Sequence, residues 1–170
     1  DTESDGFPHV WIGKAFEWVD ACVQSGRQIP PHILFALIFG QVIEGKAAEL
    51  RRQGAPALDA MTRAVTGIML EQTQRVQIPK KIGLSMRDMY WDQQRFEKRE
   101  GKYPRYFLRR PGFADAFEYF RFTSETTGEQ KELRAWWKEF IRTNPLSKDE
   151  KKDIQISAEK KARPARRRRR

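Results

Sequence analysis

The chain has 170 residues, a formal net charge of +10, and a composition that is 39% hydrophobic and 12% aromatic, which suffices for one compact domain with a hydrophobic core. Its single cysteine, Cys22, excludes an internal disulfide and a cysteine-based zinc site, and its longest apolar run, at 33–39, is too short to cross a bilayer. We therefore expect a cytoplasmic protein without a membrane span, whose basic charge suits a polyanionic partner.

The first predicted elements are a flexible lead-in and one helix. Residues 1–8 are acidic and contain Gly and Pro, which favours an irregular segment. The chain begins at Asp1 without an initiator Met, as expected of a processed chain or of a fragment. Apolar residues then recur with the helical period up to the stop signal at Gly26. The stripe that they form consists of Ile12, Phe16, Val19 and Val23.

Two further helices complete a predicted helical body region over residues 9–78. The segment 32–54 is apolar all round in its first half, which indicates a buried helix at the centre of a bundle. A third helix begins after Pro56 and ends before Pro79. Its predicted inward side chains are Leu58, Met61, Val65, Ile68 and Met69.

A fourth helix is predicted from about Lys80 to Glu100, and a helical projection divides it into two faces. The core-facing seam consists of Ile82, Met86, Met89, Gln93 and Phe96. The opposite face places one tryptophan among cations: Arg87, Trp91, Arg95, Lys98, Arg99 and Lys102. If the helix is continuous, Trp91 cannot share a core with the seam.

The remaining pattern predicts a short basic turn at 103–110, a long helix after Pro111, and a last helix over 129–142 that contains Trp136 and Trp137. No segment alternates with the period of a strand. The fold class is therefore all-α, a compact bundle of six or seven helices with a disordered basic C-terminal tail. We divide the chain into the lead-in, the helical body, a second helical region at 79–147 to which the charge pattern described next assigns RNA binding, and the Arg/Lys-rich tail at 148–170.

The positive charge is concentrated in two places. Residues 95–110 contain seven cations and two acids, and residues 148–170 contain eleven cations and four acids, so these segments carry +5 and +7 and leave −2 for the rest. In the first segment Tyr103, Tyr106 and Phe107 alternate with the cations. Cations that neutralise phosphates beside aromatics that stack on bases are typical of surfaces for single-stranded nucleic acid.

A structural interpretation of the same residues stays open. A charged helix face is often only solvated, with long side chains that cover Trp91, or with Trp91 packed on a neighbouring helix. The extension of the basic face into 102–110, the interleaved aromatics and the slightly acidic remainder of the chain favour RNA binding instead.

Signals of catalysis are scarce. No glycine-rich phosphate loop is present, and His9 and His32 lie outside any metal-binding motif, so both are interpreted as surface or capping residues. Asp88 and Asp92 lie one helical turn apart, but Arg95 and Arg99 follow them, which favours ordinary ion pairs over a metal site. Cys22 is interpreted as a small hydrophobic residue.

The spacing of residues in 86–120 resembles that of bacterial poly(A) polymerases, in the tRNA nucleotidyltransferase/poly(A) polymerase superfamily. The pattern consists of Arg87-Asp88, Gln93-x-Arg95, Arg99-x-Gly101-Lys102, Pro111-x-Phe113 and Ala116. The stretches PPHILFALIF, IPKKIGLSMRD and ELRAWWKEF are also similar to segments of that family, so the resemblance covers about 11–170.

The resemblance implies the RNA-binding C-terminal region of an enzyme that adds adenylates to RNA 3′ ends in mRNA processing and RNA decay. The family's Gly-Gly or Gly-Ser dipeptide and its paired metal-binding aspartates occur nowhere in these residues. We therefore expect no cofactor in this chain and no activity of it alone, with ATP and Mg²⁺ held by a catalytic head outside it. The implied partners are single-stranded RNA 3′ ends and that N-terminal head.

The predicted RNA-binding residues come from the basic face, the following segment and the end of the tail. They are Arg87, Trp91, Arg95, Lys98, Arg99, Lys102, Arg105, Arg109, Arg110, Arg166, Arg167, Arg168, Arg169 and Arg170. Two alternatives remain: an independent α-helical adaptor that binds ribosomal RNA or an acidic protein, and the body of a CCA-adding tRNA nucleotidyltransferase.

Overall fold

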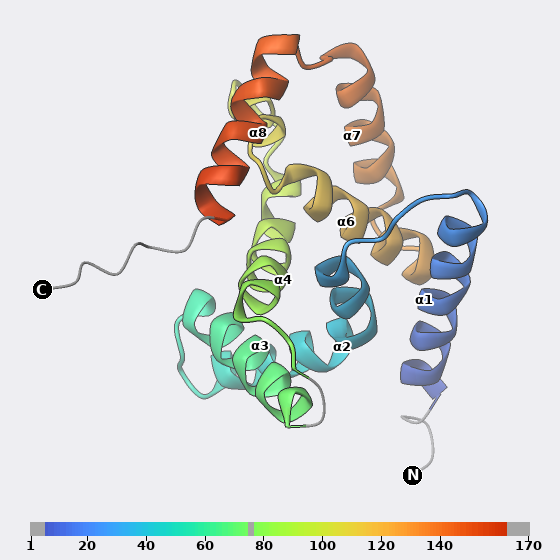
Figure 1. Ribbon diagram of the computed structural model, residues 1–170, viewed down its shortest axis with the longest axis vertical. Helices are drawn as coiled ribbons and strands as arrows, with labels where there is room; N and C mark the ends of the chain where they lie inside the picture. The colour runs from blue at the N-terminus through green and yellow to red at the C-terminus, as the bar shows by residue number, and fades with distance from the viewer. Residues whose placement is uncertain (1–5, 75–76, 163–170) are drawn as a thin grey trace, which may run out of the picture.

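The computed structural model describes residues 6–74 and 77–162, and in them the fold is all-helical, as predicted (Figure 1). The elements are α1 (Gly6–Gln24), α2 (Pro31–Arg52), α3 (Ala57–Thr73), α4 (Lys80–Asp92), the 3₁₀ helix η1 (Gln93–Glu97), α5 (Tyr103–Leu108), α6 (Phe113–Thr127), α7 (Lys131–Thr143) and α8 (Lys148–Ala162). This part of the chain thus has eight α-helices instead of six or seven, because the predicted basic turn and part of the predicted tail are helical.

Helix α2 is the centre of the bundle, as its all-round apolar sequence predicted. It contacts α1, α3, α4 and α6. Ile33, Leu37 and Ile43 are buried along it. Within the described ranges, no helix combines the length and the apolar character that a membrane span requires.

Gly40 lets α2 and α6 approach each other closely. A Cβ added at this position would lie 2.5 Å from the Tyr119 hydroxyl oxygen, a distance that real contacts do not reach. The same hydroxyl donates to Glu44 at 3.1 Å, and the Tyr90 hydroxyl of α4 donates to the Ala36 carbonyl at 2.8 Å. These bonds join α2, α4 and α6 around buried tyrosines whose rings meet edge to face.

An aromatic cluster holds the second half of the fold together. Phe96 stacks on Phe120 with the ring centroids 4.6 Å apart and meets Phe107 edge to face at 4.9 Å. Trp137 of α7 is buried beside them and donates its indole N–H to the Phe96 carbonyl at 2.8 Å. The predicted seam of the fourth helix is confirmed, since Met86 and Phe96 are fully buried. The basic segment is therefore built on a rigid core.

The apolar stripe predicted for the first helix is turned by one residue, roughly 100° around the helix, from the side that packs. Ile12, Phe16 and Val23 are exposed. The buried side of α1 consists of Trp11, Ala15 and Cys22. Trp11 donates to the Leu37 carbonyl at 2.6 Å and meets Phe122 edge to face. A large ring with a satisfied N–H therefore outweighs the smaller apolar side chains of the stripe.

Two smaller expectations for the N-terminal half were also wrong. Gly6–Pro8 belongs to α1 instead of the lead-in, because proline is tolerated in the first turn of a helix. Leu58 is exposed, whereas Ala60 and Ala64 are buried in the helix that packs on α2. Small residues permit the closest helix approach. The rest of the predicted lead-in lies outside the described residues.

The fourth helix is not continuous to Glu100. It ends at Asp92, passes into η1, and becomes extended at Lys98. Residues three apart eclipse in a 3₁₀ helix, and this brings Arg95 over Asp92. The helical projection therefore holds for Arg87 and Trp91 but fails for the cations that follow.

Residues 148–162 form α8 and are not the disordered segment that we expected. The helix begins at a capping box, in which the Glu150 N–H donates to the Ser147 hydroxyl at 3.1 Å and the Ser147 N–H donates to the Glu150 carboxylate at 2.8 Å. The S-x-x-E signature of this box is present at 147–150. The expectation of disorder rested on the composition of the tail and did not use it. Residues 163–170, with the predicted Arg166 to Arg170, lie outside the described part.

Candidate nucleic-acid interface

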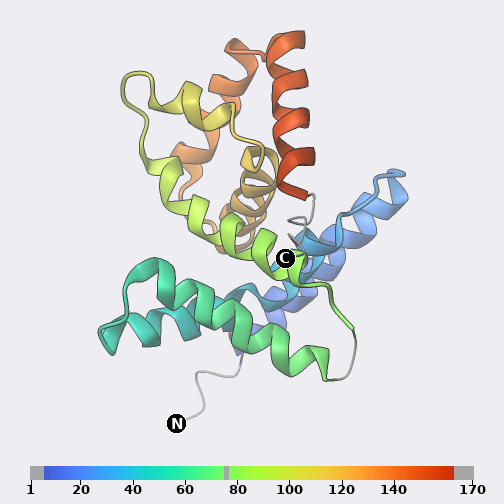
Figure 2. The same ribbon diagram turned by 60° about the vertical axis from the view of Figure 1, so that its left-hand side comes forward.

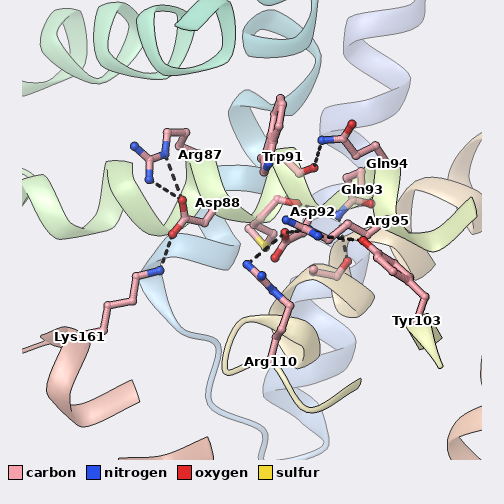
Figure 3. A network of polar contacts seen from close by, with 12 residues as sticks. Arg87, Asp88, Trp91, Asp92, Gln93, Gln94, Arg95, Tyr103, Arg110 and Lys161 are labelled. Carbon is pink, nitrogen blue, oxygen red and sulfur yellow. Dashed lines mark hydrogen bonds and ion pairs between the residues drawn. The ribbon is translucent and has the colours of Figure 1, made fainter. Parts of the chain in front are cut away.

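The first group of predicted residues surrounds Asp92, at the junction of α4 and η1 (Figure 3). Asp92 is only 3% exposed, and its Oδ1 accepts from Arg95 Nε at 2.7 Å and lies 3.6 Å from Arg110 Nη2. Arg95 also donates to the Tyr103 hydroxyl at 2.8 Å. Partial burial lowers the pKa of Arg95, but the bonds to Tyr103 and Asp92 outweigh it and raise the pKa above its ordinary value. Arg95 is thus fixed by two hydrogen bonds and charged, and Arg110 forms an ion pair with the same carboxylate.

The second group joins α5 to α8. Arg105 donates to both carboxylate oxygens of Glu150, at 2.8 and 2.7 Å, and to the Asn144 carbonyl at 2.8 Å. Arg109 lies 3.4 Å from the same carboxylate. The Ser147 N–H, together with these two arginines, holds the pKa of the Glu150 carboxyl below its ordinary value. Glu150 therefore stays ionised between two guanidinium groups.

The third group links α4 to the end of α8 (Figure 3). Asp88 Oδ1 accepts from Arg87 Nε and Nη2 at 3.0 and 2.6 Å, and its Oδ2 accepts from Lys161 Nζ at 2.6 Å. Burial raises the pKa of Asp88, but Lys161 and Arg87 overcome this and lower it below its ordinary value. Trp91 is half-buried one turn after Arg87, and among the described residues it has no aromatic ring partner.

A fourth group lies at the turn between η1 and α5. Gly101 has a φ of +59°, which favours glycine, and it turns the chain between Lys98, Arg99 and Lys102. Lys98 Nζ lies 5.3 Å from the centre of the Tyr103 ring, and Arg99 Cζ lies 5.9 Å from that of Trp136. Of the aromatics that alternate with the cations in the sequence, Tyr103 thus forms a cation–π pair with Lys98, whereas Tyr106 is exposed and Phe107 is buried in the core. The ring under Arg99 is Trp136, from α7.

The three ion-paired groups share one electrostatic property. Each has a single carboxylate, from Asp92, Glu150 or Asp88, and two cations, so each keeps a net charge of +1. Ion pairs that are partly exposed add little to stability. Their effect is to hold guanidinium groups in fixed positions while the surface stays positive, an arrangement that suits phosphate oxygens.

The structure thus does not place the predicted residues on one helical face. Arg87 and Trp91 share a side of α4, whereas the other cations belong to separate groups on η1, α5 and the loops around them. Sequence reasoning missed Lys161 and Trp136 as members of these groups. The stacking of Trp136 on Phe140, one turn away, was available as an i, i+4 aromatic pair.

The carboxylates and histidines of the described part form no group of three or more that could hold a metal ion. Each of the two aspartates is ion-paired and shared by two cations. Asp92 pairs with Arg95, as predicted, and with Arg110. Asp88 pairs instead with Arg87 and Lys161, and Arg99 lies over Trp136. His32 Nε2 lies 2.6 Å from Asp115 Oδ2 and connects α2 to α6. These residues do not fit a Mg²⁺ site for nucleotidyl transfer, which requires free carboxylates. The His9 side chain is outside the description.

A family model for the arginine-rich C-terminus of polymerase A matches residues 53–170, from just before α3 to the end of the chain. The chain is also similar to poly(A) polymerase I of Salmonella typhi, with 26% identity over 137 residues, 79% of this chain and 30% of that protein. The poly(A) polymerase I of Haemophilus influenzae is 26% identical over 144 residues, 84% of this chain and 32% of that protein. The chain thus spans about a third of the length of these curated relatives.

Proposed function

This chain belongs to the polymerase A arginine-rich C-terminus family, and from that membership we propose that it is the RNA-binding part of a polymerase that adds adenylates to RNA 3′ ends. Its substrate is single-stranded RNA. The basic groups hold the phosphates, and the exposed Tyr106 and half-buried Trp91 stack on bases.

One observation supports this proposal above the others: each of three carboxylates is shared by two cations, and the three groups all border η1, α5 or α4. If these arginines served only the stability of the fold, we would expect one carboxylate for each of them. The excess charge, held by ion pairs in a fixed geometry, is suited to an external polyanion.

We also propose that the chemistry belongs to a catalytic head outside these 170 residues. ATP and Mg²⁺ would bind there, because Asp88 and Asp92 are each engaged by two cations. In this chain, Arg95, Arg105 and their neighbours hold and orient RNA and take no part in the chemical step.

The test measures binding of the full chain to single-stranded RNA, duplex RNA and tRNA over a series of salt concentrations. A variant that lacks residues 163–170 loses six arginines. Each phosphate contact on a single strand contributes about −0.7 to the log–log salt slope, so we expect the slope to flatten by up to about 4. An unchanged slope would show that these arginines do not touch RNA, and no binding to any RNA would refute the function.

The adaptor alternative is supported by the apolar side of α1, where Ile12, Phe16 and Val23 are exposed. Exposed apolar surface of this kind suits a protein contact. In the polymerase interpretation that contact would be with the catalytic head. Failure to bind RNA in the assay above would leave the adaptor as the better account. A CCA-adding enzyme is less favoured, since both relatives named above are poly(A) polymerases.

A further inference from the structure

An apolar groove of about 420 Å³ lies between α3 and α4, outside the basic groups described above. Its lining includes Val65, Met69, Ile78, Gly83 and Leu84. Leu84 is 53% exposed, whereas Val65 and Met69 are buried behind it. A concave, mostly apolar site of this volume is in the range that binds small ligands.

Two cations, Lys80 and Arg87, complete the lining of the groove. Asp88 fixes the Arg87 guanidinium through Nε and Nη2, and Lys161 shares that carboxylate. These three side chains together keep one positive charge. An apolar surface beside fixed positive charge is suited to a ligand that combines a flat ring with a phosphate.

Trp91 lies one helical turn beyond Arg87, the last residue of α4 that lines the groove. Leu84, Arg87 and Trp91 are three and four residues apart, a spacing that places them on one side of α4. Figure 3 shows Arg87 and Trp91 projecting from α4 away from Lys161. Leu84 and Trp91 are seven positions apart, which is about 10 Å along the helix axis. At about 3.4 Å per stacked base, about three base steps would span this distance.

We propose that this groove binds one unpaired nucleobase of single-stranded RNA, with the neighbouring phosphates on Lys80 and Arg87. The inference rests on the proposed RNA-binding function and adds to it a place where a base is recognised. The base ring packs on Leu84 and Ile78 above the buried Val65 and Met69, and the guanidinium of Arg87 meets a phosphate. A strand that stacks on Trp91 reaches the groove without a break.

Two glycine variants test this proposal. A Cβ added at Gly83 would lie 3.8 Å from both Met69 Cγ and Val65 Cγ1, in ordinary van der Waals contact, so Gly83→Ala adds a methyl group to the groove without a clash. The control is Gly67→Ala in α3, where an added Cβ meets nothing within 4 Å. Both changes replace a helical glycine with alanine, which favours helix formation.

The probes are a fluorescent single-stranded oligoadenylate and an oligonucleotide of equal length whose bases are removed. We expect Gly83→Ala to weaken oligoadenylate binding about threefold or more at fixed salt and to leave the abasic probe unaffected. Gly67→Ala should change neither affinity. Equal losses on both probes, or no loss on either, would overturn the proposal. If the unmodified chain binds neither probe, the proposed function itself has failed.

Two further measurements cover other outcomes. If Gly83→Ala lowers the melting temperature, photocrosslinking of an azidoadenine oligonucleotide to the unmodified chain shows instead whether a base lies in the groove. Attachment within residues 62–87 supports the proposal, and attachment only elsewhere overturns it. A dimer of the unmodified chain that Gly83→Ala disrupts, with oligoadenylate binding unchanged, would overturn it and identify the groove as a contact between two copies.

Discussion

At the scale of single residues, cations that look equivalent in the sequence differ in what holds them. Arg105 makes two hydrogen bonds to Glu150 of α8 and one to the Asn144 carbonyl at the end of α7, and Arg95 is fixed between Asp92 and Tyr103. Lys98 and Arg99 instead lie over aromatic rings. Loss of Arg105 would therefore disturb the fold as well as RNA binding, whereas loss of Arg99 would act mainly on the ligand.

Trp91 is the residue for which stacking on RNA can be separated from packing. Base stacking on an aromatic side chain is worth about 1–3 kcal/mol, so we expect Trp91→Ala to weaken RNA binding about 5- to 100-fold. Because Trp91 is only half-buried and has no ring partner among the described residues, the melting temperature should change little. The measurements are RNA affinity and thermal unfolding of the same variant.

Trp18 provides the control, since it is also partly buried but contacts Phe122 and Arg27, far from the basic segment. Trp18→Ala should lower the melting temperature without changing the RNA affinity of the folded protein. The reverse pattern, in which Trp91→Ala unfolds the chain and its folded fraction binds RNA normally, would reject the stacking role.

Gly40 tests the contact between α2 and α6. An alanine there would place its Cβ 2.5 Å from the Tyr119 hydroxyl. We expect Gly40→Ala to lower the free energy of unfolding by about 1–3 kcal/mol, measured by urea denaturation, because overpacking forces the helices apart. Gly45→Ala, in the same helix with no atom within 4 Å of its added Cβ, should instead raise it by up to about 1 kcal/mol. Equal changes in the free energy of unfolding for the two variants would contradict a close approach of α2 and α6 at Gly40.

At the scale of elements, α8 differs from the other helices in how little of its surface it buries. Its residues are mostly exposed, and it returns toward α4 beside the basic segment (Figure 2). Two ion-paired residues near its ends, Glu150 and Lys161, connect it to α5 and α4. Since a helix with so little apolar contact gains little from burial, its position depends on these polar connections.

This dependence predicts a pH effect. The folded-state pKa of Glu150 lies below its ordinary value of 4.5, so the stabilisation from Glu150 is complete above pH 4.5 and is lost as the pH falls through the lower folded value. We expect the NMR amide signals of α8 to shift in that acid range, while the amide signals of α2 keep their positions because α2 stays folded. In Glu150→Gln they should already be changed at neutral pH. An α8 that keeps its signals well below pH 4.5 would contradict this.

At the scale of the whole molecule, the aromatic cluster around Phe96 connects η1, α5, α6 and α7 into one support for the basic surface. The tyrosine contacts around Gly40 connect α2, α4 and α6. Helix α6 belongs to both sets of contacts, and α4 belongs to the second through Tyr90, so RNA held at Arg87 and Trp91 would be coupled to the helical body. The apolar side of α1 lies apart from these contacts.

The chain alone should not incorporate nucleotides from ATP into RNA, whether Mg²⁺ or Mn²⁺ is present. Nucleotidyl transfer requires metal ions held by carboxylates, and Asp88 and Asp92 are each shared by two cations. The measurement is extension of a labelled RNA 3′ end by the purified chain, and metal-dependent extension would contradict the expectation.

The sequence by itself determined the all-α class, the central place of α2, and the core seam of Met86, Met89 and Phe96. These follow from apolar periodicity, which registers how much surface each helix buries. It also predicted which segment is basic and aromatic. The resemblance to poly(A) polymerases, confirmed by the family match, came from spaced residues in that same segment.

Only the tertiary structure decided which side of α1 packs, where the fourth helix ends, and which carboxylate each arginine meets. Trp11 is buried in place of the stripe of Ile12, Phe16 and Val23 because the Leu37 carbonyl and the Phe122 ring contact it. Asp92 and Glu150 pair with arginines up to 45 residues away in the chain. Such contacts depend on how the helices lie against one another, and periodicity within one helix carries no information about that.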